Sequence, residues 1–268
     1  MIPVAFDYQR ATTVDEALKA LSGDSKILAG GHSLLPAMKL RLNQPAKLID
    51  ITKITSLKGI KEEDGEIVIG AATTHAEIAS NSLIKKNLPF FAEGASIIGD
   101  IQVRNHGTIG GSLAHADPAA DWSALVLAAD AVLEVQSSSA KRRIKASDFF
   151  TGLFSTTLSE DEIIIGVRIP IPPTGTKTNY QKFAQPASRF AIVGCAVMRK
   201  PGGKTNIAFT GVSDTPFRDS AAEAASSIDD AVNAAIANVS IMSDHYASED
   251  YRKHLAKVYL RKALQAVS

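Results

Sequence analysis

Apolar residues recur at helical spacing in several stretches of the chain, and most of these stretches begin at a helix-capping signal. Residues 13–16 form a capping box that is followed by apolar positions on one face. A second capping box at residues 74–77 predicts a helix that ends near Ser80. The pattern predicts further helices over residues 89–98, from Asp121 onward, and over residues 221–240 and 249–266.

Shorter apolar and β-branched runs alternate with these helices and predict strands. Residues 57–60 and 66–71 flank Asp64-Gly65, which is typical of a hairpin turn. The other predicted strands are 26–29, 47–51, 131–136, 162–170, 180–183, 192–199 and 205–212. Residues 170–177 combine proline, glycine and polar residues without periodicity and are the best candidate for a linker. The whole pattern predicts an α+β chain of two domains.

Composition and charge narrow the class of protein. Hydrophobic residues make up 45% of the 268 residues and charged residues 21%, which is ordinary for a globular protein with a buried core. The chain has 29 Lys and Arg against 28 Asp and Glu, a net charge of +1. This balance argues against nucleic acid and anionic membranes as partners. The N-terminal residues lack the pattern of a signal peptide and no run approaches about 20 apolar residues, so we expect a soluble protein without membrane insertion.

Cysteine content bears on cofactors and compartment. Cys195 is the only cysteine, so the chain by itself forms no disulfide and cannot hold an iron–sulfur cluster through thiolates. Its apolar neighbours predict a small side chain buried in a strand. A reducing, cytoplasmic location is the corresponding expectation.

Two Gly-Gly pairs are the most informative local features. The first lies in Leu28-Ala29-Gly30-Gly31-His32-Ser33-Leu34-Leu35-Pro36, at the end of a predicted strand. The second lies in Thr108-Ile109-Gly110-Gly111-Ser112-Leu113-Ala114-His115-Ala116-Asp117-Pro118, ahead of a helix that we expect to be capped by an Asp. Glycine lets backbone amides approach a bound anion, so two such bends could grip both ends of a diphosphate. Taken alone, the first pair is more often only a turn after a strand than a phosphate-binding loop.

Other nucleotide and metal sites are disfavoured. The first pair lacks the Gly-x-Gly-x-x-Gly pattern of a Rossmann domain and the Gly-Lys-Ser/Thr of a P-loop. His32, His106, His115, Asp117 and Asp121 are ligand types, but no two have the spacing of a zinc site, so we expect no metal.

The paired motifs resemble the FAD signatures of the medium subunit of bacterial molybdenum hydroxylases, the family of carbon monoxide dehydrogenase and the flavin domain of xanthine dehydrogenase. The resemblance extends over nearly the whole chain, including Tyr180-Gln181-Lys182-Phe183 and Ser188-Arg189-Phe190-Ala191. It implies a two-lobed FAD-binding domain of the vanillyl-alcohol-oxidase/PCMH type at residues 1–172, with lobes at about 1–55 and 56–172. Residues 178–268 would form a C-terminal domain of antiparallel sheet plus helices, of the carbon monoxide dehydrogenase flavoprotein type.

The resemblance also implies site residues for non-covalent FAD. The diphosphate cradle would consist of Ala29, Gly30, Gly31, His32, Ser33, Leu34, Thr108, Gly110, Gly111 and Ser112. Asp121 would bind near the adenosine ribose and Ile164 would pack near a ring system. Lys182 would approach the flavin pyrimidine edge and Phe190 would lie near the isoalloxazine. Ser112 departs from the Asn common in the family, which puts FAD affinity in question.

Without the family, these last residues have simpler interpretations. Ile164 would be strand core, Lys182 a solvated side chain and Phe190 a core aromatic.

The family further implies a role in electron transfer. A small subunit would carry [2Fe-2S] clusters, a large subunit the molybdopterin cofactor, and the flavin subunit would pass electrons to an external acceptor, in a dimer of heterotrimers. No catalytic acid–base group or nucleophile is then expected on this chain. The resemblance leaves open the substrate, whose pocket would lie on another chain, and the acceptor: NAD, a quinone, oxygen or another carrier. The alternatives are a self-sufficient FAD-dependent oxidoreductase of the same flavin-domain superfamily and a non-catalytic scaffold.

Overall fold

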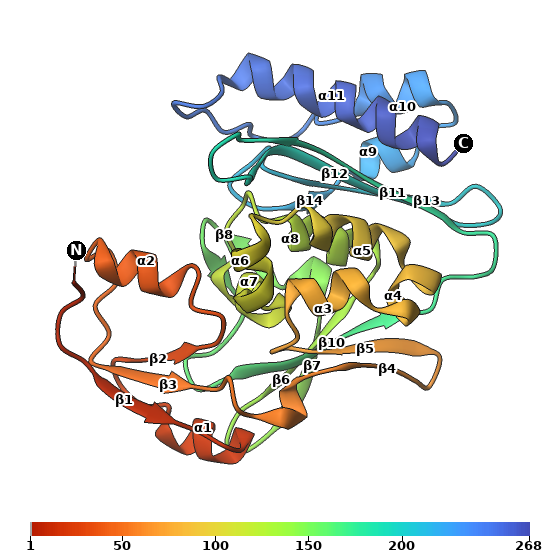
Figure 1. Cartoon of the computed structure of the whole chain (residues 1–268). Helices are drawn as coiled ribbons and strands as arrows, with labels where there is room; N and C mark the ends of the chain where they lie inside the picture. Colours follow the sequence, from red (N-terminus) through yellow and green to blue (C-terminus); the bar gives the residue numbers. More distant parts are fainter. Residues whose placement is uncertain (1) are drawn as a thin grey trace.

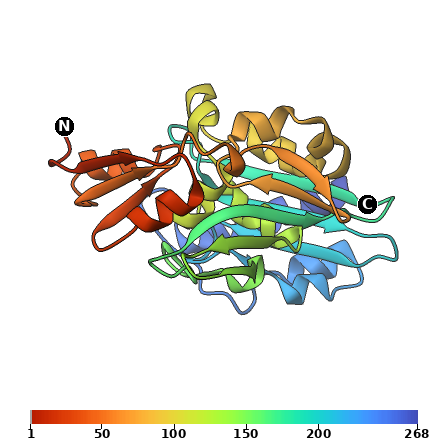
Figure 2. The same cartoon turned by 90° about the horizontal axis from the view of Figure 1, so that it is seen from below.

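The computed structural model describes residues 2–268 and divides into an N-terminal lobe, a middle lobe and a C-terminal sheet covered by helices (Figure 1). The N-terminal lobe contains a parallel three-stranded sheet in the order β1-β3-β2 with two helices. Its elements are β1 Asp7–Arg10, α1 Val14–Ala20, β2 Ser25–Leu28, α2 Leu34–Lys39 and β3 Lys47–Asp50. Figure 2 shows this lobe to one side of the rest of the molecule.

The middle lobe is an antiparallel five-stranded sheet in the order β4-β5-β10-β6-β7, with helices on one face. Its strands are β4 Ile60–Glu63, β5 Glu66–Gly70, β6 Val132–Gln136, β7 Lys141–Lys145 and β10 Ile163–Pro170. Its helices are α3 His75–Ser80, α4 Ser82–Asn87, α5 Pro89–Ser96, α6 Ile101–His106, α7 Ile109–His115 and α8 Asp121–Ala128. Short elements complete the lobe: 3-10 turns at Thr55–Leu57 and Ala146–Asp148, and the pair β8 Phe150–Gly152 and β9 Ser155–Thr156.

The C-terminal part is a four-stranded antiparallel sheet in the order β11-β12-β13-β14. Its elements are β11 Lys177–Ala184, β12 Ala191–Arg199, β13 Thr205–Thr210, β14 Phe217–Arg218, α9 Ser220–Glu223, α10 Ile228–Ala234 and α11 Glu249–Ala266. One face packs on α5 and α8 of the middle lobe, and α9 to α11 cover the other face (Figure 1). The predicted α+β architecture with a C-terminal antiparallel sheet and helices is therefore confirmed.

Strand β12 shows why both faces of this sheet are apolar. Ala196 and Met198 belong to the core of the middle lobe, whereas Cys195 and Val197 belong to the core beneath α9 to α11. Successive side chains of a strand point to opposite faces, so a strand buried on both sides has a continuous apolar sequence. Cys195 is fully buried as predicted, and burial raises the pKa of its thiol.

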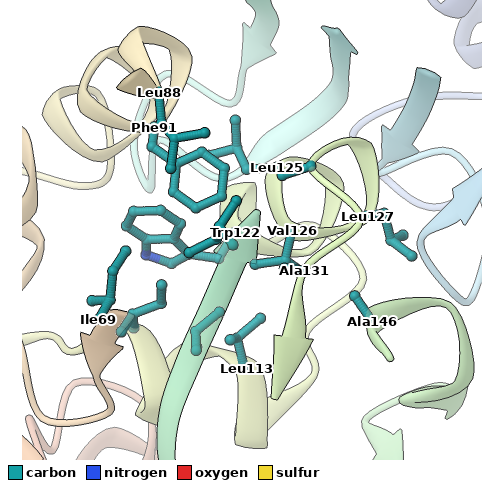
Figure 3. Packing of buried hydrophobic residues seen from close by; sticks show 14 of the residues in the cluster. Ile69, Leu88, Phe91, Leu113, Trp122, Leu125, Val126, Leu127, Ala131 and Ala146 are labelled. Carbon is teal, nitrogen blue, oxygen red and sulfur yellow. The ribbon is translucent and has the colours of Figure 1, made fainter. Parts of the chain in front are cut away.

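The middle-lobe core is built around Trp122, which is fully buried between Phe91 and Ile69 (Figure 3). The Phe91 and Trp122 rings are 5.5 Å apart in an edge-to-face arrangement, which aromatic pairs prefer. Large aromatic side chains contribute much of the apolar area in such a core. The core thus anchors α5 and α8 over the sheet and fixes the segments that follow them.

Several predicted elements differ from the structure. The first hairpin strand is Ile60–Glu63 rather than residues 57–60, because residues 55–57 form a 3-10 turn. The helix predicted over residues 221–240 is two short helices. Asp219 caps α9 and Ser227 caps α10, and side chains that bond the local backbone in this way favour helix ends over helix interiors. None of the helices within residues 2–268 combines the length and the apolar composition needed to cross a bilayer.

Candidate functional site

A cleft of about 900 Å³ lies where the N-terminal lobe, the middle lobe and the C-terminal sheet meet. Its walls include the loop between β2 and α2, the start of α7, the segment before β10 and residues 188–190. The structure brings together every predicted site residue except Lys182: Ala29, Gly30, Gly31, His32, Ser33, Leu34, Thr108, Gly110, Gly111, Ser112, Asp121, Ile164 and Phe190. A volume near the upper end of the usual range for ligand pockets accommodates a large ligand.

The first diglycine loop presents free backbone donors to this cleft. The amides of residues 30–34 donate no hydrogen bond to any residue in the described range 2–268. Gly31 has a φ of +75°, a conformation that glycine adopts without strain. A Cβ on Gly30 would lie 2.2 Å from the carbonyl oxygen of His106, so glycine is required there for the two motifs to meet. Consecutive free amides at a cleft wall form an anion-binding concavity.

The second diglycine segment differs from the predicted bend, because Gly110 and Gly111 lie in the first turn of α7. The amide of Gly110 donates to the Ala71 carbonyl oxygen at 2.9 Å and that of Gly111 to Thr108 Oγ1 at 3.2 Å. The amide of Ser112 donates to the Thr108 carbonyl oxygen at 3.0 Å. The amides that were expected to bind a ligand are therefore already paired, that of Gly110 with Ala71 and those of Gly111 and Ser112 with the helix cap Thr108. This segment offers close backbone approach at Gly111 and the hydroxyl group of Ser112 instead.

Asp121 belongs to a buried polar network that joins the middle lobe to the C-terminal sheet. Its Oδ2 accepts from Lys182 Nζ at 2.8 Å and its Oδ1 from the Tyr180 hydroxyl at 2.5 Å. The side chains of Lys182 and Asp121 are only 3% and 5% exposed. Burial raises the pKa of Asp121, and the Lys182 ammonium and the Tyr180 hydroxyl oppose that shift. Burial together with the neighbouring carboxylate raises the pKa of Tyr180 well above its ordinary value.

The structure corrects two expectations for this network, the cap role of Asp121 and the placement of Lys182. Asp121 is the first residue of α8 rather than its cap, since Ala120 occupies the cap position and makes no side-chain bond. Lys182 is neither solvated nor part of the cleft wall, and its ammonium reaches the site only through Asp121. Its remaining contact is the carbonyl oxygen of Ile97 at 3.3 Å.

The two apolar site residues, Ile164 and Phe190, both line the cleft and differ in exposure. Ile164 in β10 is 5% exposed, and Phe190 before β12 is 42% exposed. The amide of Ala191 donates to the Ala119 carbonyl oxygen at 3.2 Å, which ties the Phe190 segment to the loop before α8. An aromatic side chain with this exposure at a cleft is available to a planar ligand, whereas Ile164 belongs to the strand core and also reaches the cleft.

The structure adds cleft residues that sequence reasoning did not assign to this site. His115 and Asp117 appeared only as metal-ligand types, and both line the cleft. Burial raises the pKa of Asp117. His75 and Phe154 also line it, and nothing in their local sequence beyond the capping box before His75 indicated a functional position. These residues reach the cleft only because folding brings together chain segments that are far apart in the sequence.

Comparisons with known proteins agree with this geometry. Residues 4–172 match the domain family described as the FAD binding domain in molybdopterin dehydrogenase, and residues 178–267 match the CO dehydrogenase flavoprotein C-terminal domain. The chain is 38% identical over 281 residues to the carbon monoxide dehydrogenase medium chain of Hydrogenophaga pseudoflava, covering 99% of this chain and 98% of that relative. It is 28% identical over 274 residues to the xanthine dehydrogenase FAD-binding subunit of Escherichia coli O157:H7, covering 96% and 94%.

The same family appears among solved structures. A chain of carbon monoxide dehydrogenase from Hydrogenophaga pseudoflava superposes with a TM-score of 0.95 at 40% identity, covering 100% of this chain and 98% of that chain. These relatives are subunits of dehydrogenases, so the chain belongs to an oxidoreductase class. With both of its parts matched and a cleft lined by the two diglycine motifs, the chain belongs to the family of FAD-binding medium subunits of molybdenum hydroxylases.

Proposed function

We propose that this chain is the electron-transferring flavin subunit of a heteromeric molybdenum hydroxylase. It would take electrons from [2Fe-2S] clusters of a partner subunit and pass them to an external acceptor. The observation that carries the proposal is the run of unpaired amides at residues 30–34, which faces the same cleft as the second diglycine segment. Such amides suit a diphosphate without needing a cluster of cationic side chains.

The residues present fit a non-covalently bound FAD. Gly30 to Leu34 would hold the diphosphate through their amides, and Gly111 and Ser112 of the adjoining second segment would contact it beside them. Asp121 and Ile164 would contact other parts of the cofactor, and Phe190 would shield the isoalloxazine. Lys182 would act by holding Asp121 in place and balancing its charge. When bound, FAD supplies the capacity to accept and release electrons singly or in pairs.

The remaining redox centres would lie on other chains. A single buried cysteine provides no set of thiolates for a cluster, so the iron–sulfur centres require a partner. Relatives are named as medium chains or subunits of carbon monoxide dehydrogenase and of nicotine 6-hydroxylase, which supports a multi-subunit complex. We propose a small iron–sulfur subunit and a large molybdopterin subunit as partners, in a cytoplasmic dimer of heterotrimers.

Purification of the chain without partners tests whether it binds FAD but leaves substrate oxidation to another subunit. The purified protein should bind FAD non-covalently, with flavin released on denaturation, and should show little or no substrate turnover. Rapid turnover by the isolated chain would support a self-sufficient oxidoreductase instead. Absence of FAD binding at micromolar concentrations of FAD would support the alternative of a non-catalytic scaffold.

Gly111→Val tests the cradle. The new side chain would begin 2.9 Å from Thr108 Oγ1 and occupy the space between the motifs. We expect flavin retention to be lost, with Gly111→Ala giving a smaller loss in the same direction. Circular dichroism of both variants controls for folding, and unchanged flavin content in folded Gly111→Val would contradict the assignment.

Co-expression with the neighbouring genes tests the partners. The expected product is a heteromer that contains iron and molybdenum by elemental analysis. A stable homo-oligomer that recruits no such partner would contradict the proposed assembly.

A further inference from the structure

A buried histidine–tryptophan pair lies beside the junction of the two diglycine motifs. His75 is the first residue of α3 and is 4% exposed, and the indole N–H of Trp122 donates to its Nδ1 at 3.0 Å. The His75 amide donates to the carbonyl oxygen of Gly107 at 3.0 Å. The capping box of Thr74 and Glu77 holds the start of the helix. Both the backbone and the ring of His75 are thus fixed.

The tryptophan determines which imidazole nitrogen carries the proton. An indole N–H only donates, so Nδ1 must be the unprotonated acceptor and the proton of the neutral ring must lie on Nε2. Within residues 2–268, Nε2 has no hydrogen-bond partner. Burial, aided by His32 and Arg104, lowers the pKa of His75 to about 4, so the ring is neutral near pH 7.

The position of Nε2 relates it to the cleft. A Cβ on Gly107 would lie 2.6 Å from Nε2, so only glycine lets the imidazole approach this closely. A Cβ on Gly30 would in turn lie 2.8 Å from the Cα of Gly107. His75, Gly107 and Gly30 all line the same cleft. The unpartnered N–H therefore lies next to the loop whose amides are also free.

We propose that His75, held by Trp122 as the Nε2-protonated tautomer, is a further anchoring residue that donates a hydrogen bond to the phosphate portion of the bound cofactor. The inference rests on the proposed function, because it assumes that FAD occupies the cleft. A neutral, pre-oriented donor binds an anion without the desolvation cost of burying a lysine or arginine there. Hydrogen bonds to charged groups are stronger than neutral ones, and loss of one corresponds to a weakening of about 10-fold or more.

Trp122 acts through His75 in this scheme and is a positioning residue. Without the indole donor, Nδ1 and Nε2 compete for the proton, and part of the population presents an acceptor to the phosphate. Trp122→Phe keeps an aromatic ring against Phe91 and removes the donor. It should weaken phosphate binding by less than His75→Phe does, since some of the Nε2-protonated form remains.

Binding titrations with three probes test the assignment on the isolated chain. FAD, ADP and riboflavin are titrated calorimetrically into wild type, His75→Phe, His75→Gln and Trp122→Phe. His75→Phe should lower the affinity for FAD and for ADP about 10-fold or more. The affinity for riboflavin, which has no phosphate, should stay within about two-fold of the wild-type value. His75→Gln keeps an N–H donor and should recover part of the loss. His254→Phe is the control, because its exposed side chain belongs to α11 and does not line the cleft.

The outcomes separate this inference from the proposed function. Unchanged FAD affinity in folded His75→Phe overturns the inference while leaving the flavin assignment intact. Equal losses for FAD and riboflavin would show a purely structural role and also overturn it. A wild-type chain that binds no FAD overturns both.

Nitrogen NMR of the imidazole gives a readout that needs no variant. The Nε2-protonated tautomer is expected for His75 in the wild-type protein, and its Nε2 resonance should shift on addition of ADP. Trp122 is the only tryptophan, so its single indole N–H resonance reports the same bond. An Nδ1-protonated His75 would overturn the proposal.

Discussion

At the scale of single residues, the contribution of an ion pair to stability depends on how deeply its two charges are buried. Asp121 and Lys182 form an almost fully buried pair between α8 and β11, whereas Asp130 and Lys200 form a solvent-accessible pair across the same interface. Burial removes hydration from both charges, so each member of the inner pair depends on the other. The outer pair is screened by water and contributes little.

This contrast leads to a prediction for two lysine variants. Lys182→Met should destabilise the protein by about 3–5 kcal/mol, because it leaves the Asp121 carboxyl group buried without its cation. Lys200→Met should cost less than about 1 kcal/mol, since its partner is exposed. Urea unfolding of both variants measures the difference, and equal losses would show that burial of the inner pair does not matter.

His75 leads to a prediction about pH. Its pKa is about 4 in the folded protein against 6.5 as its ordinary value. Below pH 6.5 the unfolded chain takes up a proton that the folded protein does not, so stability from this residue falls as pH drops toward 4. The loss at pH 4 is on the order of 3 kcal/mol. Urea unfolding from pH 7.5 to 4.5 should show a steeper decline for wild type than for His75→Gln, and parallel curves would contradict the shifted pKa.

At the scale of elements, short capped helices present the site. Helix α7 begins directly at the cleft, and Thr108 Oγ1 caps it by accepting from the amide of Gly111. Helix α1 has the same type of cap at Thr13, away from the cleft. The Thr108 cap therefore has two roles at α7. It gives a free amide of the first helical turn a hydrogen-bond partner, and it holds Gly111 in place.

Alanine substitution of the two caps separates these roles. Thr108→Ala and Thr13→Ala should each cost about 1 kcal/mol of stability. Only Thr108→Ala should also weaken FAD binding, because its helix carries Gly111 and Ser112. Thermal unfolding together with FAD titration provides the measurement. A similar loss of FAD affinity in Thr13→Ala would indicate a general loss of structure instead.

At the scale of the whole molecule, the middle lobe and one face of the C-terminal sheet share a core. Tyr180, Ala196, Met198 and Ala208 of the C-terminal sheet pack in the same cluster as Trp122. The Asp121 network crosses the same boundary. The core of the part that carries both diglycine motifs is thus completed by residues of the C-terminal sheet.

We propose domains at residues 1–172 and 178–268 that are separable in sequence and dependent on each other in stability. Limited proteolysis should cut within residues 171–177, which form an exposed connection, and the two pieces should stay associated. Residues 1–172 expressed alone should lack cooperative unfolding and should not retain FAD, because the apolar face of α8 and the Asp121 carboxyl group would meet water. A stable, yellow fragment of residues 1–172 would contradict this dependence.

Local patterns alone were sufficient for much of the secondary structure. The helix predicted over residues 249–266 is α11 as observed, and the capping box at Thr74 is present, because these signals arise from neighbours a few residues apart. The short helices α2, α4, α6 and α7 were missed. Each is six or seven residues long, too short for an apolar periodicity to appear.

The residues that gather in the cleft could be named through the family resemblance that the paired motifs carry, but their partners could not. Sequence reasoning gave Gly110 and Gly111 a bend with free amides, but the amide of Gly110 donates to the Ala71 carbonyl oxygen and that of Gly111 to the Thr108 cap of α7. Lys182 is 61 positions from Asp121, and His75 is 47 positions from Trp122. Hydrogen bonding and burial depend on which segments the packed core brings together, and spacing along the chain carries no information about that. Composition, capping and glycine placement define the elements and the ligand class, while the buried charges and the tautomer of His75 follow only from the packing of α8 against its neighbours.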